Sequence, residues 1–463
     1  MRYISTRGAA PALGFEDVVL TGLARDGGLY IPERWSPVSP GDIRAFAGAD
    51  YADTAYRVMR PYIEEACIGD AALRTLIGET YGVFDDAAVA PLRQLDGETW
   101  LLELFHGPTL AFKDFALQFL GRMFEHILAK HDRRITIVGA TSGDTGSAAI
   151  EACQERENLD IFMLHPAGRV SDVQRRQMTT VLAANVHNIA ISGTFDDCQD
   201  LVKGMFNDQP FRDAMSLSAV NSINWARVMA QIVYYFTAAA QLGAPGQPIS
   251  FVVPTGNFGN VYAGYAAHKM GLTDAKLIVA TNQNDILTRF FEAGDMSLAP
   301  VRPSFSPSMD IQISSNFERL LFDLFERDGA AVADAIGKFR ETGTLPDGEK
   351  LRAAAGSVFS GFRTVEAETL AAIRETYQTS GVLVDPHTAV GLGAVRQISA
   401  NGSRRIVLAT AHPAKFPEAV EQATGIRPTL PAHLADLFDR EERCETLAND
   451  LAAVQTYVRD KVQ

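Results

Sequence analysis

The chain has 463 residues, of which 42 are basic and 56 acidic, giving a formal net charge of −14. Hydrophobic residues make up 47% of the chain and charged residues 21%, a balance typical of a globular protein with a large buried core. The negative charge disfavours nucleic acid and anionic membranes as partners, because both bind clustered Lys and Arg. We therefore expect any anionic ligand to be held locally, by backbone amides or a few arginines.

Cysteines and apolar segments bear on the cellular compartment. The four cysteines are scattered, with no CxxC pair and no histidine at a metal-ligand spacing, so we expect neither a disulfide framework nor a bound metal. The N-terminus, MRYISTRGAA, lacks the apolar core of a signal peptide. The longest apolar stretch, residues 228–240, is too short to span a bilayer. These features predict a cytoplasmic protein without a membrane partner.

The first hundred residues are rich in turn signals, such as Asp26-Gly27-Gly28, and carry short helical patterns over residues 53–62 and 71–81. They contain no strand followed by a glycine-rich phosphate turn. This pattern predicts a small, mainly helical N-terminal domain over residues 1–92. The alternative is a packed extension with no stability of its own.

From about Thr99 onward, short apolar runs alternate with longer amphipathic stretches. Such alternation predicts parallel sheets with helices on both faces, and these sheets place ligands at the carboxyl ends of their strands. The region is long enough for two lobes. The predicted strands are residues 135–138, 160–164, 186–191, 249–253, 277–280 and 406–409, and the clearest helices are residues 113–129 and 196–206.

Two stretches predict irregular loops. Residues 294–308 contain three prolines, and residues 243–248 combine Pro with Gly. The first loop is followed by Ser315-Asn316-Phe317-Glu318, which has the spacing of a capping box and predicts the start of a helix.

The segment 105–115, FHGPTLAFKDF, places a lysine near a predicted helix start. Pro108 keeps the preceding residue out of a helix, and Thr109 is a suitable N-cap. Lys113 would then lie in or just after the first turn of an apolar helix. The alternative is an ordinary solvated helix lysine.

Two effects would lower the pKa of Lys113 from its ordinary value of about 10.4. The positive end of the helix dipole costs a cation about 0.3–1 kcal/mol, and Phe112 and Phe115 would desolvate the ammonium. A lysine that is partly neutral is a nucleophile able to form a Schiff base. Lys415 is the main competitor for this role.

Two glycine-rich turns each follow a predicted strand and precede a predicted helix. The first, TSGDTG at residues 141–146, offers amides and the hydroxyls of Ser142 and Thr145 to a carboxylate or phosphate. The second, PTGNFGN at residues 254–260, has glycines that let the backbone approach a ligand closely. Neither has the spacing of a Walker A loop or of a dinucleotide fingerprint. Singly, each is also compatible with an ordinary tight connection.

Three further segments carry polar groups. Residues 222–227 place amides, a hydroxyl and a guanidinium within two helical turns, which is compatible with an oxyanion fork or with a helix cap. Residues 385–389 and 409–415 place polar groups where strands should end, and caps are commoner than catalysts at such positions.

Together, these segments resemble the threonine synthase family. The matching motifs are FHGPTLAFKD (105–114), TSGDTG (141–146), PTGNFGN (254–260), DPHTAVG (385–391) and ATAHPAKF (409–416). The segments YISTRG (3–8), ARDGGLYIP (24–32), SINWARV (222–228) and SPSMDIQISSNFERL (306–320) are also similar. The resemblance therefore spans almost the whole chain in the same order. Members of this family are enzymes that use pyridoxal 5′-phosphate (PLP).

The resemblance implies the tryptophan-synthase-β-like fold, or PLP fold type II. This α/β fold has two lobes with parallel sheets flanked by helices. In this chain we expect, in addition, a small, mainly helical N-terminal domain over residues 1–92. We expect the PLP-binding catalytic region over residues 93–430, with a smaller lobe over about 113–215 and a larger lobe formed by the remainder. Residues 431–463 are expected to form a C-terminal helical extension.

The resemblance also implies roles for individual residues. Lys113 would be the catalytic lysine, which binds PLP and transfers protons. The residues implied to bind PLP are Lys113, Phe112, Asp144, Gly256, Asn257, Phe258, Gly259, Asn260 and Thr410. The residues implied to bind substrate are Thr141, Ser142, Gly143 and Thr145 at the α-carboxylate, and Ser222, Asn224 and Arg227 at the phosphate.

The implied reaction converts O-phospho-L-homoserine and water to L-threonine and phosphate, the last step of threonine biosynthesis. A catabolic PLP lyase giving 2-oxobutyrate and ammonia would use the same lysine and turns. A non-catalytic protein that binds PLP or a phosphometabolite is a second alternative. A sugar-phosphate enzyme without PLP would need a carboxylate pair or a metal cluster, which the sequence does not show. The expected partner is the small-molecule substrate, with the chain acting as a monomer or homodimer.

Overall fold

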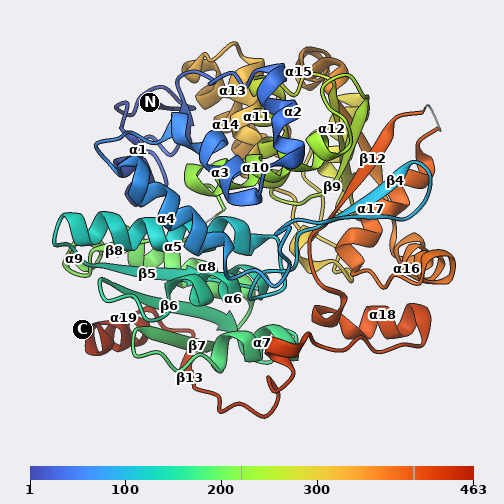
Figure 1. The fold of residues 1–463 in the computed structure, drawn as a ribbon. Helices are drawn as coiled ribbons and strands as arrows, with labels where there is room; N and C mark the ends of the chain where they lie inside the picture. The colour runs from blue at the N-terminus through green and yellow to red at the C-terminus, as the bar shows by residue number, and fades with distance from the viewer. Residues whose placement is uncertain (221, 400–401, 463) are drawn as a thin grey trace.

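Two mostly parallel sheets form the centres of the structure (Figure 1). The computed structural model describes residues 1–220, 222–399 and 402–462. In the larger sheet all neighbouring strands are parallel except the edge pair β3–β4. Its strands in spatial order are β11 (Phe359–Arg363), β10 (Ala275–Thr281), β9 (Ile249–Pro254), β12 (Arg404–Ala409), β4 (Thr99–Glu103) and β3 (Leu92–Gln94). The α/β class predicted from the sequence is confirmed.

The smaller sheet is entirely parallel, and one of its strands comes from the C-terminal part of the chain. Its strands in spatial order are β13 (Glu445–Ala448), β7 (Val186–Ser192), β6 (Leu159–Pro166), β5 (Ile135–Ala140) and β8 (Leu217–Ser218). Because β13 pairs with β7, residues 431–463 are not the wholly helical extension expected from the sequence. The short, exposed sequence of β13 carries no strand signal of its own, and the free edge of β7 supplies its hydrogen bonds.

Side chains of the larger sheet alternate between two separately covered faces. Val253 and Leu408 belong to the core beneath α10 and α11, whereas Val252 and Val407 pack with the side of the sheet covered by α16 and α17. The helices of this lobe are α10 (Trp225–Gln241), α11 (Gly259–Met270), α12 (Ile286–Ala293), α13 (Phe317–Leu324), α14 (Gly329–Thr342), α15 (Gly348–Ala355), α16 (Glu366–Ser380), α17 (Pro386–Gln397) and α18 (Pro417–Thr424). Burial on both faces explains why β9 is apolar at all positions except Ser250.

The smaller sheet is covered in the same way. Ile137 and Ile161 pack toward α5 and α6, whereas Val138 and Phe162 pack toward α8 and α19. The helices of this lobe are α5 (Lys113–Lys130), α6 (Asp144–Cys153), α7 (Asp172–Thr179), α8 (Phe195–Asn207), α9 (Gln209–Ala214) and α19 (Leu451–Lys461).

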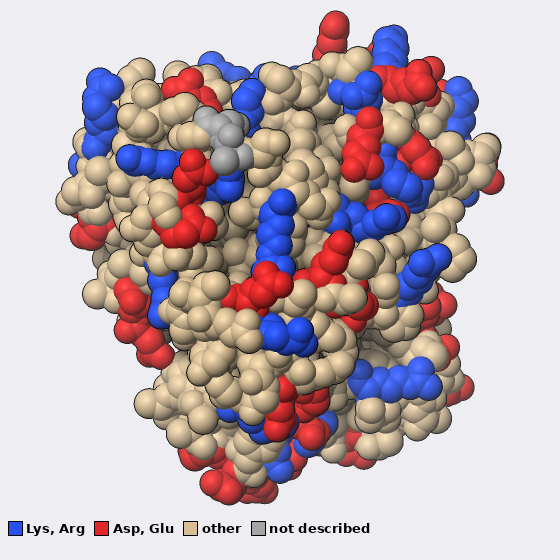
Figure 2. All heavy atoms as spheres, turned by 90° about the vertical axis from the view of Figure 1, so that its right-hand side faces the viewer, with Lys and Arg blue, Asp and Glu red and all other residues tan. Residues whose placement is uncertain are grey.

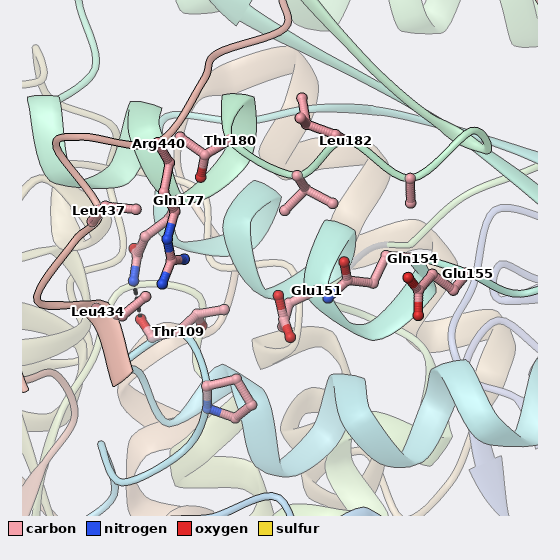
Figure 3. Close-up of a pocket in the computed structure, with 13 residues that line it drawn as sticks. Thr109, Glu151, Gln154, Glu155, Gln177, Thr180, Leu182, Leu434, Leu437 and Arg440 are labelled. Carbon is pink, nitrogen blue, oxygen red and sulfur yellow. Dashed lines mark hydrogen bonds between the residues drawn. The ribbon is translucent and has the colours of Figure 1, made fainter. Parts of the chain in front are cut away.

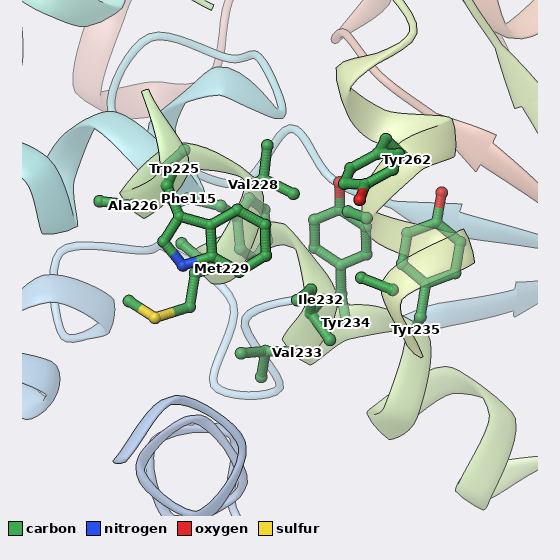
Figure 4. Close-up of a cluster of buried hydrophobic side chains, with 14 of the residues drawn as sticks. Phe115, Trp225, Ala226, Val228, Met229, Ile232, Val233, Tyr234, Tyr235 and Tyr262 are labelled. Atoms are coloured by element: carbon green, nitrogen blue, oxygen red, sulfur yellow. The ribbon is translucent and has the colours of Figure 1, made fainter. Parts of the chain in front are cut away.

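The N-terminal residues share their core with helices of both lobes. This part comprises the hairpin of β1 (Tyr3–Ser5) and β2 (Tyr30–Pro32) with α1 (Phe15–Thr21), α2 (Pro40–Ala45), α3 (Tyr51–Met59) and α4 (Asp70–Tyr81). The ring centroid of Trp225, at the start of α10, lies 6.1 Å from those of Tyr3, Trp35 and Tyr62. Figure 4 shows Trp225, Phe115 and Met229 among the buried side chains of the same cluster. The helical N-terminal domain is therefore packed against both lobes.

Helix α13 begins at Phe317, where the sequence predicts a helix start, but the predicted capping box is absent. Glu318 turns instead toward the N-terminal residues, pairing with Arg7 at 2.8 Å and accepting a hydrogen bond from Thr6 at 2.6 Å. Glu318, which completes the predicted capping pattern, therefore makes tertiary contacts with a distant segment instead of capping the helix. The six predicted strands and both predicted loops are present, with ends shifted by one or two residues.

The surface agrees with the composition. Figure 2 shows one face on which basic and acidic side chains are interspersed, without a large basic area. Among the described helices, none combines the length and the apolar character needed to cross a membrane.

Candidate active site

Lys113 is the first residue of α5. Thr109 is not the N-cap predicted from the sequence, because the helix starts four residues later and Phe112 occupies the N-cap position. The buried carboxylate of Asp114 instead accepts hydrogen bonds from the Thr109 hydroxyl at 2.6 Å and the Thr109 amide at 2.8 Å. These contacts fix the loop that leads into the lysine.

The Lys113 amine is enclosed and faces a carboxylate. Only 11% of its side chain is exposed, and Nζ lies 3.2 Å from Asp144 Oδ2 and 5.8 Å from the ring centroid of Phe112. Burial lowers the pKa of Lys113, and the nearby cations Lys415 and Arg227 lower it further against the opposing effect of Asp144. An ordinary solvated lysine is thereby excluded. Phe115 faces the hydrophobic core, so the expected desolvation comes from Phe112 and the protein around it.

Asp144 is the centre of the polar network. Its Oδ1 accepts from Lys415 Nζ and from Gln174 Nε2, both at 2.8 Å, and its Oδ2 accepts from Ser308 Oγ at 3.1 Å. Burial alone would raise the pKa of Asp144, but Lys113 and Lys415 together hold it well below its usual value. Sequence reasoning missed Gln174 and Ser308. Ser308 lies in a segment that resembles the family, whereas Gln174 carries no local signal.

The turn between β9 and α11 has the geometry of an anion nest. The backbone amides of residues 256–260 donate no hydrogen bond to any residue that the structure describes. Phe258 is left-handed, with φ of 62°, which turns these amides toward one side at the start of α11. The side chain of Asn257 is held by Ser222 and by the Ser315 amide. A phosphate fits here because the free donors are already in place.

Replacing Gly256 with Ala is expected to weaken PLP binding about tenfold or more. A Cβ at this position would lie 2.8 Å from the Ser308 carbonyl oxygen and 3.0 Å from Met309 Cα, so backbone must move and the nest must open. Titration of the apoprotein with PLP measures the affinity. Gly337→Ala is the control, since its Cβ meets no atom within 4 Å. Equal PLP affinity in the Gly256 variant and the control would contradict the nest.

The TSGDTG turn leads from β5 into α6. Thr141 Oγ1 accepts from the amides of Gly143 and Gly146, at 3.0 and 2.9 Å, so Thr141 shapes the turn. Within the described residues, the amides of Ser142, Asp144 and Thr145 donate no hydrogen bond. These three donors remain available for a carboxylate.

In the segment 222–227, the side chains of Asn224 and Arg227 have different surroundings. Asn224 is fully buried, caps α10 by accepting from the Ala226 amide, and donates to the Val19 carbonyl. These two bonds fix Asn224 at the start of α10, and its contact with the substrate phosphate stays a prediction. Arg227 is also buried, and its Nε and Nη1 have no hydrogen-bond partner among the described residues. Burial lowers the pKa of Arg227 to about 10, and an unpaired buried guanidinium is suited to an anion.

Thr410, at the end of β12, is buried, and its carbonyl accepts from the Phe112 amide at 2.9 Å. This bond places the end of β12 beside the residue that precedes Lys113. Asp385 is a helix cap, accepting from the amides of His387 and Thr388 at the start of α17. Asp385 thus caps a helix, whereas Thr410 is bonded to the residue that precedes Lys113.

A separate cavity of about 500 Å³ lies on the other side of Thr109 (Figure 3). Its lining includes Glu151 of α6, Gln177 of α7 and Arg440. The Thr109 carbonyl accepts from Gln177 Nε2 at 3.1 Å and from Lys415 Nζ at 2.8 Å, so this loop separates the cavity from the lysine pair. The polar network around Asp144 does not line it.

Comparison with known proteins decides the family. Family models described as "Threonine synthase N terminus", "Pyridoxal-phosphate dependent enzyme" and "Threonine synthase, C-terminal" match residues 2–81, 85–338 and 388–458. The threonine synthase of Pseudomonas aeruginosa is 58% identical over 99% of this chain and 98% of its own length. The chain belongs to the threonine synthase family. The resemblance seen in the sequence is confirmed.

Solved structures of threonine synthases have the same fold. A PLP-bound threonine synthase from Brucella melitensis superposes with a TM-score of 0.97 at 53% identity, covering 100% of this chain and 99% of the other. The threonine synthase from yeast superposes with a TM-score of 0.93 at 38% identity, covering 99% and 98%. PLP fold type II is therefore confirmed, and the chain is a PLP-dependent enzyme. The free amides of residues 256–260 fit the cofactor phosphate.

Proposed function

We propose that this member of the threonine synthase family converts O-phospho-L-homoserine and water to L-threonine and phosphate. The observation that carries the proposal is the enclosed Lys113 amine, 3.2 Å from Asp144, with unpaired anion-binding donors on α6, α10 and α11. An acidic chain needs such local sites to hold two phosphates and a carboxylate. Free Arg227 nitrogens and free amides supply them.

Different residues of the chain would transfer the proton and bind the cofactor. Lys113 would hold PLP, and once the substrate amine has displaced it, its free amine removes the proton from the substrate Cα, because its lowered pKa favours the neutral amine. PLP, when bound, supplies an electron sink for the charge left on that carbon. The amides of residues 256–260 would hold the cofactor phosphate, with Asn257 fixed by its contact with Ser222. Thr410, after the end of β12, would face the cofactor ring, and Phe112 lies beside the Lys113 amine.

The substrate is held at both ends. The free amides of Ser142, Asp144 and Thr145, in the turn bent by Gly143 and Thr141, bind the α-carboxylate. Arg227 binds the substrate phosphate and stabilises it as it leaves from Cγ. Departure of the phosphate requires that Lys113 also removes a proton from Cβ. Lys113 then returns a proton to Cγ, water adds at Cβ, and a proton returns to Cα.

Replacing Arg227 with Met is expected to lower kcat/KM for the phosphorylated substrate about 10- to 100-fold, as a lost charge-assisted hydrogen bond would. The fold should persist, because no described residue loses a partner when the free guanidinium nitrogens go. Steady-state kinetics and thermal unfolding measure the two effects. Unchanged kcat/KM in the Arg227 variant would remove this residue from the phosphate site. Arg212→Met, at an exposed position, is the control.

Product analysis in H₂¹⁸O tests the function. The proposed reaction gives equal amounts of threonine and phosphate, with ¹⁸O in the threonine hydroxyl and none in the phosphate, because the C–O bond breaks and water adds at Cβ. 2-Oxobutyrate with ammonia would identify the catabolic lyase. PLP binding with no product would leave the non-catalytic binder. Either of these results would contradict the proposal.

A further inference from the structure

Two lysines share one buried carboxylate at this site. Lys415 Nζ lies 2.8 Å from Asp144 Oδ1, and Lys113 Nζ lies 3.2 Å from Asp144 Oδ2. Asp114, the other buried carboxyl that acts on Lys415, is bonded to Thr109 and contacts neither amine. Asp144 alone therefore touches both ammonium groups, and one carboxylate cannot fully offset two cations.

Of the two lysines, Lys415 makes the shorter contact with Asp144 and is the more deeply buried. It is 0% exposed at the end of the short helix η5 (Pro413–Lys415), and it also donates to the Thr109 carbonyl at 2.8 Å. The donors of Lys415 are thus directed at a carboxylate and a carbonyl, and no open space leads to its amine. Lys113 has the longer contact and the more open side chain.

The charged groups around Lys113 come from four elements. Asp144 of α6 is the anion, while Lys415 of η5 and Arg227 of α10 are cations that act on the Lys113 amine. His387 of α17 acts on Asp144 from a further side, and its Nδ1 donates to Asp385 Oδ2 at 2.7 Å. The cations therefore outnumber the one carboxylate that touches Lys113.

We propose that Lys415 is a positioning residue that occupies Asp144 and thereby keeps Lys113 sufficiently uncharged to capture PLP. Capture joins the Lys113 nitrogen to the PLP aldehyde carbon while the aldehyde oxygen leaves as water, and an ammonium lacks the electron pair that this bond needs. The inference rests on Lys113 being the PLP lysine, as in the proposed function. After capture, Lys415 remains as the counter-charge of Asp144.

The test measures the charge of Lys113 without substrate. The full-length chain, cleared of PLP and checked by circular dichroism, is labelled with acetic anhydride from pH 6 to 10, and labelling of each lysine is read by mass spectrometry. Lys350, which is exposed, is the internal reference. We expect Lys113 to become half-labelled at a lower pH than Lys350. Lys415→Gln removes the charge but keeps a donor for the Thr109 carbonyl, and Lys415→Arg keeps the charge.

Lys415→Gln is expected to raise the half-labelling pH of Lys113 by about one unit, a tenfold loss of neutral amine at a given pH. Lys415→Arg should stay near the original value. The pH at which PLP uptake is half-maximal, followed by absorbance, should move in the same direction. An unchanged or lower half-labelling pH in Lys415→Gln would overturn the proposal, as would an equal shift in Lys415→Arg. If Lys415→Gln does not fold, the original chain decides: a half-labelling pH of Lys113 that is no lower than that of Lys350 would overturn the proposal. These results do not depend on which product the enzyme makes.

Discussion

Replacing Lys113 with Ala is expected to lower turnover about 10³-fold or more, since the variant loses both the covalent link to PLP and the group that moves the Cα proton. The fold should remain, because the removed amine is one of two cations on Asp144 and Lys415 continues to compensate that carboxylate. Turnover is measured by phosphate release, and the fold by circular dichroism and thermal unfolding.

The matched control for this variant is Lys350→Ala, which removes an exposed lysine. It should retain normal turnover. Normal turnover in Lys113→Ala as well would contradict the assignment of the cofactor lysine and, with it, the role of the loop before α5.

Replacing Asp144 with Asn is expected to reduce the free energy of unfolding by about 3–5 kcal/mol, because it leaves Lys415 buried without its anion. Asp144 is 6% exposed and bonds both lysines, Gln174 and Ser308, so no solvent replaces the lost charge. Urea unfolding of the full chain measures the change. The variant should also lose activity, since the lysine pair is no longer held in place.

An exposed ion pair provides the comparison for Asp144. Asp334 contacts Lys338 at 2.7 Å with both side chains more than half exposed, so Asp334→Asn should change the unfolding free energy by less than about 1 kcal/mol. A similarly small change in Asp144→Asn would mean that the central carboxylate is not the compensating charge described above.

Much of the fold follows from local patterns. Buried parallel strands such as β5, β6 and β9 are mainly apolar, so they are visible in the sequence. Strands β3 and β13 escape prediction because they are three and four residues long, largely exposed and defined by the neighbour they pair with. Their signal lies in another part of the chain.

The site also contains some residues that the sequence predicts and others that only the fold reveals. Lys113 and the two glycine turns are predictable, since each lies at an element start with a characteristic residue order. The partners of Asp144 are not, because Gln174, Ser308 and Lys415 come from separate segments that only the fold brings together. Asn224 caps α10, which is one of the two roles that the sequence of residues 222–227 leaves open.

The covalent link between PLP and the chain tests the central claim most directly. Sodium borohydride reduces this link and fixes PLP to its lysine, and mass spectrometry of the digested protein then locates it. The account predicts pyridoxyl label on the peptide that contains Lys113 and none on the peptide that contains Lys415. Label on Lys415, or an absence of label in a PLP-loaded protein, would contradict it.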